Sequence, residues 1–126
     1  MTRVESDIIL CVVNALKEIT PNVYFGKSHT VYPKINCDLR LFGEDDERCR
    51  YRLVLDYYAA DSKPITVVHM SETVRDMLNH GQAYTEDGAL ITFRKDGSGG
   101  LIDDPHEKIV HYKDAYEVSY WKNFDT

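Results

Sequence analysis

The sequence predicts an α+β fold, with a mostly antiparallel sheet, a long hairpin and two helices packed on one face. Three observations lead to this prediction: two neighbouring stretches alternate strictly between apolar and polar residues, one stretch on each side of them has helical spacing, and the chain closes with an aromatic strand. At 126 residues the chain has the size of one domain, so we assign residues 1–126 to a single unit.

The alternating stretches predict the hairpin. They run over residues 34–41 and 48–59, and a polar, glycine-containing connection at 43–47 joins them. Successive side chains of a strand point to opposite faces, so one set of residues is expected to be buried. In the first stretch these are Ile35, Cys37, Leu39 and Leu41. Cys37 and Cys49 could lie near each other across the hairpin, although two small buried thiols fit this pattern better than a disulfide.

Two segments have the spacing of amphipathic helices. The first follows Thr2 and Glu5, which have capping-box spacing, and its apolar residues recur as far as Ile19. The second begins near Pro64, with Ser62 or Lys63 at the cap, and has an apolar stripe over residues 67–78. The β-branched run at 65–68 leaves a strand there as the alternative.

The remaining elements are predicted to be short strands and turns. Residues 23–25 are expected to form a short strand, 89–95 a longer one after a turn at 86–88, and 112–121 the closing strand. The segment from Gly97 to His111 is expected to be a long loop without secondary structure. Loops of that length are commonly functional, which makes this one a candidate for an interface.

Composition excludes several classes of function. The net charge of -6 argues against non-specific binding to nucleic acid and against an anionic membrane surface. The acidic residues among the first seven positions do not fit a signal peptide, and the apolar run at 8–13 is too short to span a bilayer. We therefore expect a soluble protein made in a cytoplasm. Three cysteines do not form the framework of a secreted protein.

No pattern of catalytic or metal-binding residues is evident. The five histidines lack the spacing of a zinc site, and a calcium loop beginning at Asp96 fails because Leu101 stands where glycine is needed and Pro105 interrupts the ligands. Asp103 and Asp104 could place two carboxylates together, although such a pair before a proline is more often a solvated turn. We expect no enzyme, no metal and no cofactor.

Charged and aromatic residues provide the candidate interface. Three arginines share one face of the second hairpin strand, where they could bind a partner or pair with Asp38 and other acids across the hairpin. Four consecutive acids at the hairpin tip should repel one another and stay extended unless a basic neighbour meets them. A solvated surface is the alternative in both cases. The candidate residues are Glu44, Asp45, Asp46, Glu47, Arg48, Arg50, Arg52, Asp103, Asp104, Trp121 and Phe124.

The order of the elements resembles a known family. The helix at 7–19, the strand at 51–58, the helix at 67–78 and the closing segment at 115–121 are similar in order and pattern to tail-terminator and tail-completion proteins of long-tailed bacteriophages, also described as minor capsid or head–tail joining proteins. The resemblance covers most of the chain but includes no diagnostic motif. It therefore assigns no role to any single residue.

This resemblance implies a structural role in virion assembly. It implies a small α+β domain that forms a homohexameric ring, caps the tail tube, ends its polymerisation and docks the head connector. The expected partners are further copies of the chain, the tail tube protein and head–tail connector proteins, with DNA passing through the lumen without specific binding and no membrane involved. The expected location is the tail or neck of the virion, assembled in the bacterial host cytoplasm.

Three other functions remain open at this point. The first is another connector or head-completion protein of the same particle. The second is a small intracellular enzyme or ligand-binding domain that uses His106, Asp103 and Asp104. The third is a bacterial adaptor or regulatory module that acts as a dimer.

Overall fold

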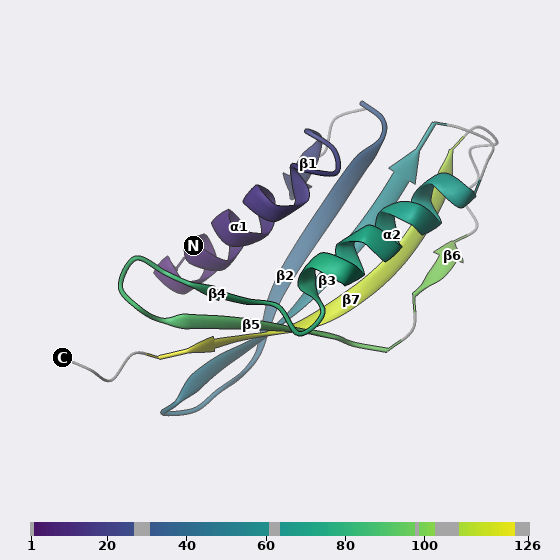
Figure 1. Ribbon diagram of the computed structural model, residues 1–126. Helices are drawn as coiled ribbons and strands as arrows, with labels where there is room; N and C mark the ends of the chain where they lie inside the picture. Colours follow the sequence, from purple (N-terminus) through teal and green to yellow (C-terminus); the bar gives the residue numbers. More distant parts are fainter. Residues whose placement is uncertain (1, 27–30, 61–63, 98, 103–108, 123–126) are drawn as a thin grey trace.

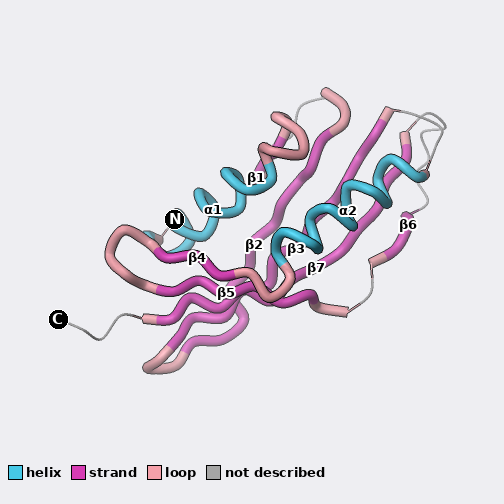
Figure 2. The backbone as a smooth tube through the Cα atoms, in the orientation of Figure 1, coloured by secondary structure: helices cyan, strands magenta, loops and turns pink. Residues whose placement is uncertain are grey.

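The computed structural model of the chain describes residues 2–26, 31–60, 64–97, 99–102 and 109–122. Within these ranges, two helices and seven strands follow one another in the order α1, β1, β2, β3, α2, β4, β5, β6, β7. The predicted α+β class with a mostly antiparallel sheet is confirmed at this level. Both helices lie in front of the twisted sheet in Figure 1, and Figure 2 shows the same layering by element type.

Helix α1 (Arg3–Leu16) begins as the sequence predicts. The Glu5 amide donates to the Thr2 hydroxyl at 3.1 Å, and the buried side chains Ile8, Val12 and Leu16 recur every four residues on the side facing the sheet. The helix ends three residues before the expected end at Ile19. The Ile19 amide bonds to the Leu16 carbonyl at 2.9 Å, a tighter turn that redirects the chain toward the sheet.

Three long strands make the centre of the sheet. β3 (Arg48–Ala59) pairs antiparallel with β2 (Lys34–Glu44) on one side and with β7 (Val110–Trp121) on the other. β1 (Val23–Phe25) forms as expected and adds to β2 in parallel. The strand order continues from β1, β2, β3 and β7 to β5 (Leu90–Lys95) and then β4 (Gln82–Tyr84), with β6 (Gly100–Ile102) also beside β7.

The free side of β7 is shared by two strands. β5 (Leu90–Lys95) pairs with its last part and β6 (Gly100–Ile102) with residues 111–113, while β4 (Gln82–Tyr84) adds to β5. Neither β4 nor β6 was predicted, because three residues are too few to establish an alternating pattern. The expectation of a loop free of structure from Gly97 to His111 is therefore wrong at residues 100–102, which form β6, and at residues 110–111, where β7 already begins. Residues 103–108 lie outside the described ranges.

Helix α2 (Ile65–Leu78) forms, so the strand alternative for its first residues is wrong. Its buried side chains include Val67, Met70, Val74 and Leu78, a stripe that packs on the central strands. Pro64 stands at the N-cap without a side-chain bond, whereas Ser62 and Lys63, the predicted caps, lie outside the described ranges. Neither helix of the described chain combines the length and apolar content that crossing a membrane requires.

The closed end of the β2–β3 pair departs from the predicted pattern. β2 continues to Glu44, with a register shift between Leu41 and Gly43, and this end extends past both helices (Figure 1). Leu41 is consequently 50% exposed, and its expected burial is wrong. Cys37 pairs in register with Leu55 and Cys49 with Glu44, so the two thiols are not cross-strand neighbours and all three cysteines are free.

Candidate protein-binding surface

The face of the sheet opposite the helices, here called the outer face, carries the predicted arginines. Arg48, Arg50 and Arg52 alternate along β3 with buried residues of the core, so they point away from the helix layer. In register beside them, β7 presents Trp121, Ser119 and Glu117. The three arginines therefore lie on one open face.

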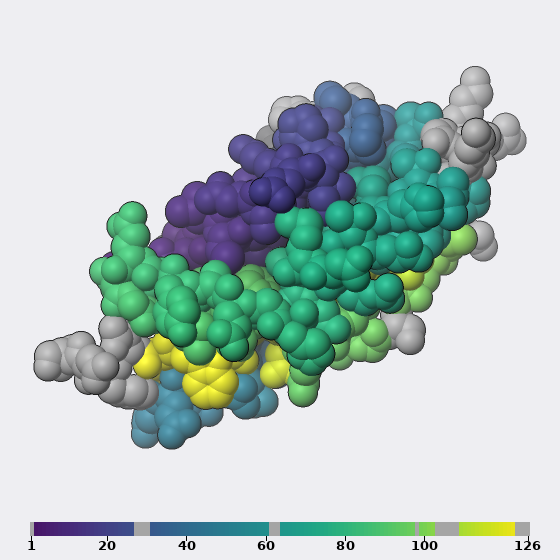
Figure 3. Space-filling view, viewed as in Figure 1, coloured from purple at the N-terminus to yellow at the C-terminus, as the bar shows by residue number. Residues whose placement is uncertain are grey.

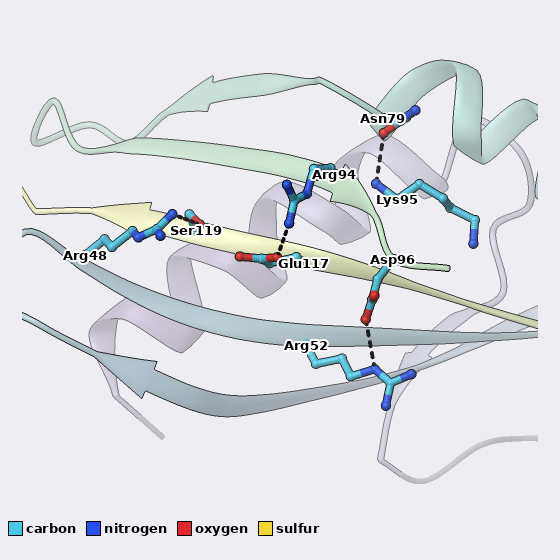
Figure 4. Close-up of polar contacts among 8 residues, drawn as sticks. All are labelled: Arg48, Arg52, Asn79, Arg94, Lys95, Asp96, Glu117 and Ser119. Carbon is cyan, nitrogen blue, oxygen red and sulfur yellow. Dashed lines mark hydrogen bonds and ion pairs between the residues drawn. The ribbon is translucent and has the colours of Figure 1, made fainter. Parts of the chain in front are cut away.

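Arg48 is held in place by two contacts with β7. Its guanidinium carbon lies 4.8 Å from the centre of the Trp121 ring, and its Nη1 donates to the Ser119 hydroxyl at 3.3 Å (Figure 4). Trp121 is fixed in turn, because its indole N–H donates to the Thr92 hydroxyl on β5 at 3.1 Å. Trp121, predicted as an interface residue, thus supports Arg48 within the same chain.

Arg50 lies over an exposed aromatic ring. Its guanidinium carbon is 5.1 Å from the centre of Phe42, which follows Leu41 at the register shift of β2 and is 53% exposed. Gly43 makes this placement possible, since a Cβ there would lie 3.0 Å from Nη2 and 3.2 Å from Nε of Arg50. An apolar ring and a cation therefore stand together beside the closed end of the β2–β3 pair.

The acid partners of the outer face differ from the predicted ones. Arg52 pairs with Asp96, at 3.4 Å, whereas Asp38 pairs with Arg40 of its own strand, at 2.8 Å. The register explains this, because Arg40 and not Asp38 stands directly opposite Arg52. All four of these side chains are more than half exposed, so both ion pairs are weak.

A cavity of about 450 Å³ opens on the outer face, and we call it the arginine-lined cavity. Arg94 on β5 joins Arg48 and Arg50 there, and its Nη2 lies 2.7 Å from Glu117 of β7 (Figure 4). Three guanidinium groups and one carboxylate therefore line the cavity, on a chain whose net charge is -6. Guanidinium groups bind carboxylates and phosphates in paired hydrogen bonds, so the cavity suits an anionic group. The polar residues that complete it are His80, Gln82, Thr92 and Ser119.

Sequence reasoning missed Arg94 and Glu117 as members of this site. Each alternates with buried neighbours in a strand that the sequence predicted, so the outward direction of both side chains could have been inferred. Their meeting depends on the β5–β7 register, which places Arg94 opposite Glu117. No pattern within either segment specifies that register.

The four acids at residues 44–47, which we call the acidic tip, form a closed turn. Asp45 accepts hydrogen bonds from the amides of Glu47 and Arg48 at 2.8 and 2.9 Å, and these bonds lower the pKa of its carboxyl. Lys122 lies 3.1 Å from the Glu44 carboxylate, whose pKa it lowers. The expectation that repulsion keeps the tip extended is therefore wrong. The tip belongs to the projecting blue segment of Figure 3.

Only two acids of the tip are available to a partner. Asp46 and Glu47 are exposed, and neither makes an ion pair with any described residue, whereas Glu44 and Asp45 are engaged within the turn. Of the other predicted interface residues, Asp103, Asp104 and Phe124 lie outside the described ranges. Among the residues that the structure describes, no three His, Cys, Asp or Glu side chains gather as a metal site requires.

A buried polar cluster lies on the other side of the sheet. Asp114 of β7 is 3% exposed and accepts hydrogen bonds from Tyr57 at 3.0 Å and from Ser71 at 2.7 Å. Burial raises the pKa of this carboxyl, and the two hydroxyl donors partly offset the rise. With its oxygens occupied by two elements of the core, Asp114 joins α2 to the sheet.

Comparison of the chain with models of known protein families gave no match, and comparison with curated protein sequences gave none.

Proposed function

We propose that this protein is a structural component of a long-tailed bacteriophage that assembles into a ring, caps the tail tube, ends its polymerisation and joins it to the head connector. The observation that carries the proposal is the pairing of two unlike surfaces on one small domain. The outer face is open and rich in arginine, and the closed end of the β2–β3 pair projects with an acidic tip. A ring built head to tail needs two such complementary surfaces on each subunit.

Exposed apolar side chains at the projecting end support a protein interface. Leu41 and Phe42 stand together in β2, and each exposes about half of its surface. Arginine beside an aromatic ring is a combination enriched at the centres of protein interfaces, and the Arg50–Phe42 contact provides it here. Burying these groups against another subunit would stabilise an assembly.

The proposed assembly is a homohexamer in the tail or neck of the virion, formed in the host cytoplasm. Its neighbours are the tail tube protein on one side and head–tail connector proteins on the other. DNA passes through the lumen, and the net charge of -6 favours a wall that does not retain it.

Native mass spectrometry at high protein concentration, with negative-stain imaging of the same sample and of tail tubes mixed with it, tests this function. We expect six copies in a ring with a central hole, and binding to tube ends. A preference for portal-filled heads would instead indicate a connector or head-completion protein. A monomer that neither self-associates nor binds tube ends would contradict the proposal.

The second candidate is a dimeric adaptor. Arg48 follows Glu47 directly in the chain and lines the cavity, so the acidic tip and the arginine-lined cavity lie near the same end of the sheet. Two neighbouring complementary surfaces can also be exchanged between two copies around a twofold axis. A discrete dimer in the same experiment would favour this alternative.

A further inference from the structure

We propose that the acidic tip of one copy docks into the arginine-lined cavity of another copy, where Asp46 and Glu47 pair with Arg48, Arg50 and Arg94. This inference deepens the proposed function and rests on its premise that copies of the chain associate.

The cavity is prepared for carboxylates before any partner arrives. Arg48 is fixed between the Trp121 ring and the Ser119 hydroxyl, and Arg50 lies over Phe42 in space that Gly43 leaves open. Cations that are already oriented lose little conformational freedom on binding. Glu117 offsets the charge of Arg94 alone, so the cavity retains an excess of positive charge.

The acidic tip is equally well prepared as the occupant. Its backbone turn is closed by the Asp45 carboxylate, and Lys122 fixes it further by donating to the Asp45 carbonyl at 2.6 Å. This arrangement leaves Asp46 and Glu47 exposed at the apex of a hydrogen-bonded turn. They do not pair with the arginines of their own chain, because β3 leads away from the apex and its arginines point to the outer face.

Charge favours a short acidic turn over a long polyanion in this cavity. The acidic tip lies beside the cavity, since Arg48 follows it in sequence, and would repel a nucleic acid strand lying across both. A single acidic turn can enter the cavity without lying across the tip. The exposed Leu41 and Phe42 lie just before the tip in β2, so they would add apolar contact at the rim of the cavity.

Two variants, each blocked on one side, test the contact. Asp46→Lys with Glu47→Lys removes the occupant and leaves the cavity intact, whereas Arg50→Glu changes the cavity and leaves the tip intact. We expect each variant alone to assemble roughly tenfold or more weakly than the wild type. Mixed together, with one of them isotopically labelled, they should form one-to-one pairs that grow no further, seen by native mass spectrometry.

Arg40→Glu is the matched control. It makes the same charge change at an exposed outer-face position of β2 that does not line the cavity, so assembly should remain at the wild-type level. Thermal unfolding of every variant in parallel checks that the monomer still folds.

The outcomes separate this contact from the proposed function. If the wild type assembles and both blocked variants assemble equally well, the contact is wrong and the ring proposal survives. If the wild type does not self-associate even on tail tubes, both are wrong. If wild-type protein binds a single-stranded oligonucleotide, and Arg50→Glu abolishes that binding without affecting assembly, the cavity belongs to nucleic acid and this inference is overturned.

Discussion

Ser71 of α2 donates a hydrogen bond of 2.7 Å to the Asp114 carboxylate of β7, and both side chains are buried. Tyr57 of β3 donates to the same carboxylate. One acidic group thus fixes the helix layer to two central strands. Since a buried carboxylate is costly unless its oxygens are hydrogen-bonded, both the protonation of Asp114 and its donors should affect stability.

The free energy of unfolding should depend on pH through Asp114. The folded-state pKa of this carboxyl is raised, chiefly by burial, so its contribution to stability is present below the ordinary pKa and is lost as pH rises through the folded pKa. Asp114→Asn removes the titration while keeping the side-chain shape. Urea unfolding from acidic to neutral pH measures the free energy of unfolding of both proteins. As pH rises, the wild type should lose stability relative to the variant. A constant difference would contradict the prediction.

Ser71→Ala should destabilise the fold by about 1.5–3 kcal/mol, the range for a hydrogen bond to a charged group. The lost donor would also leave the Asp114 carboxylate less well satisfied, because within the described part of the chain Ser71 is one of two side chains that donate to it. Thr73→Ala is the matched control, since among the described residues this exposed hydroxyl bonds only to a carbonyl of its own helix. Chemical denaturation compares the two variants, and equal losses would mean that the buried contact is unimportant.

Leu53→Ala should cost about 2–5 kcal/mol, whereas Leu41→Ala should cost about 0.5 kcal/mol or less. Both leucines occupy positions of the helix-facing side in the β2–β3 pair, but Leu53 is fully buried and Leu41 is half exposed. Thermal or urea unfolding of the monomer measures both costs. A large cost at Leu41 would show that the closed end of the β2–β3 pair packs more tightly than the exposure of Leu41 indicates.

Gly43→Ala should weaken assembly while leaving the fold intact. The added methyl group would lie 3.0 Å from Nη2 of Arg50, and the end of this flexible side chain must move away. No charge changes, so a weaker assembly would report the placement of Arg50 and not the net charge of the cavity. Native mass spectrometry across a dilution series measures the effect. Gly97→Ala is an unsuitable control, because Gly97 has φ +72° and a side chain there would strain the backbone, although its Cβ would meet nothing nearby. Gly100→Ala is the better control, since it meets nothing within 4 Å and has no such φ.

Arg52→Glu should leave assembly largely unchanged, although reversing both Arg50 and Arg52 should block it. Arg52 belongs to the same row of arginines on β3 but does not line the arginine-lined cavity. It forms an exposed ion pair with Asp96 instead. Losing that pair should cost about 0–1 kcal/mol. Comparing Arg50→Glu with Arg52→Glu by the same assay separates the cavity from the row of arginines. Equal effects would indicate that the whole row binds the partner.

The sequence supported predictions that depend on short-range periodicity and failed where distant segments meet. Alternation along β3 correctly placed Arg48 and Arg50 opposite the core. It could not reveal the register shift after Leu41, because the bulge depends on how two strands pair. The prediction that Arg52 pairs with Asp38 was wrong for a similar reason. Its observed partner, Asp96, is brought near it by the path of the chain after β5.

The candidate site could be predicted only in part. Three arginines and the acidic tip were evident as charge patterns, but the cavity also needs Arg94 and Glu117, which the β5–β7 pairing brings together. The tip itself was predicted as a repelling cluster. Its closed form depends on hydrogen bonds from backbone amides, which a pattern of charged residues does not reveal. It also depends on Lys122, which lies more than seventy residues away in the sequence.

The position of β7 has a consequence for synthesis. This strand is the last in the described sequence, yet it lies at the middle of the sheet, between β3 and the strands β5 and β6. A ribosome must therefore produce nearly all of the preceding chain before β3 gains its second neighbour, and until then Arg48 lacks the ring and hydroxyl that orient it. A nascent chain cannot display the finished surface, so recognition between copies waits until translation has passed this strand.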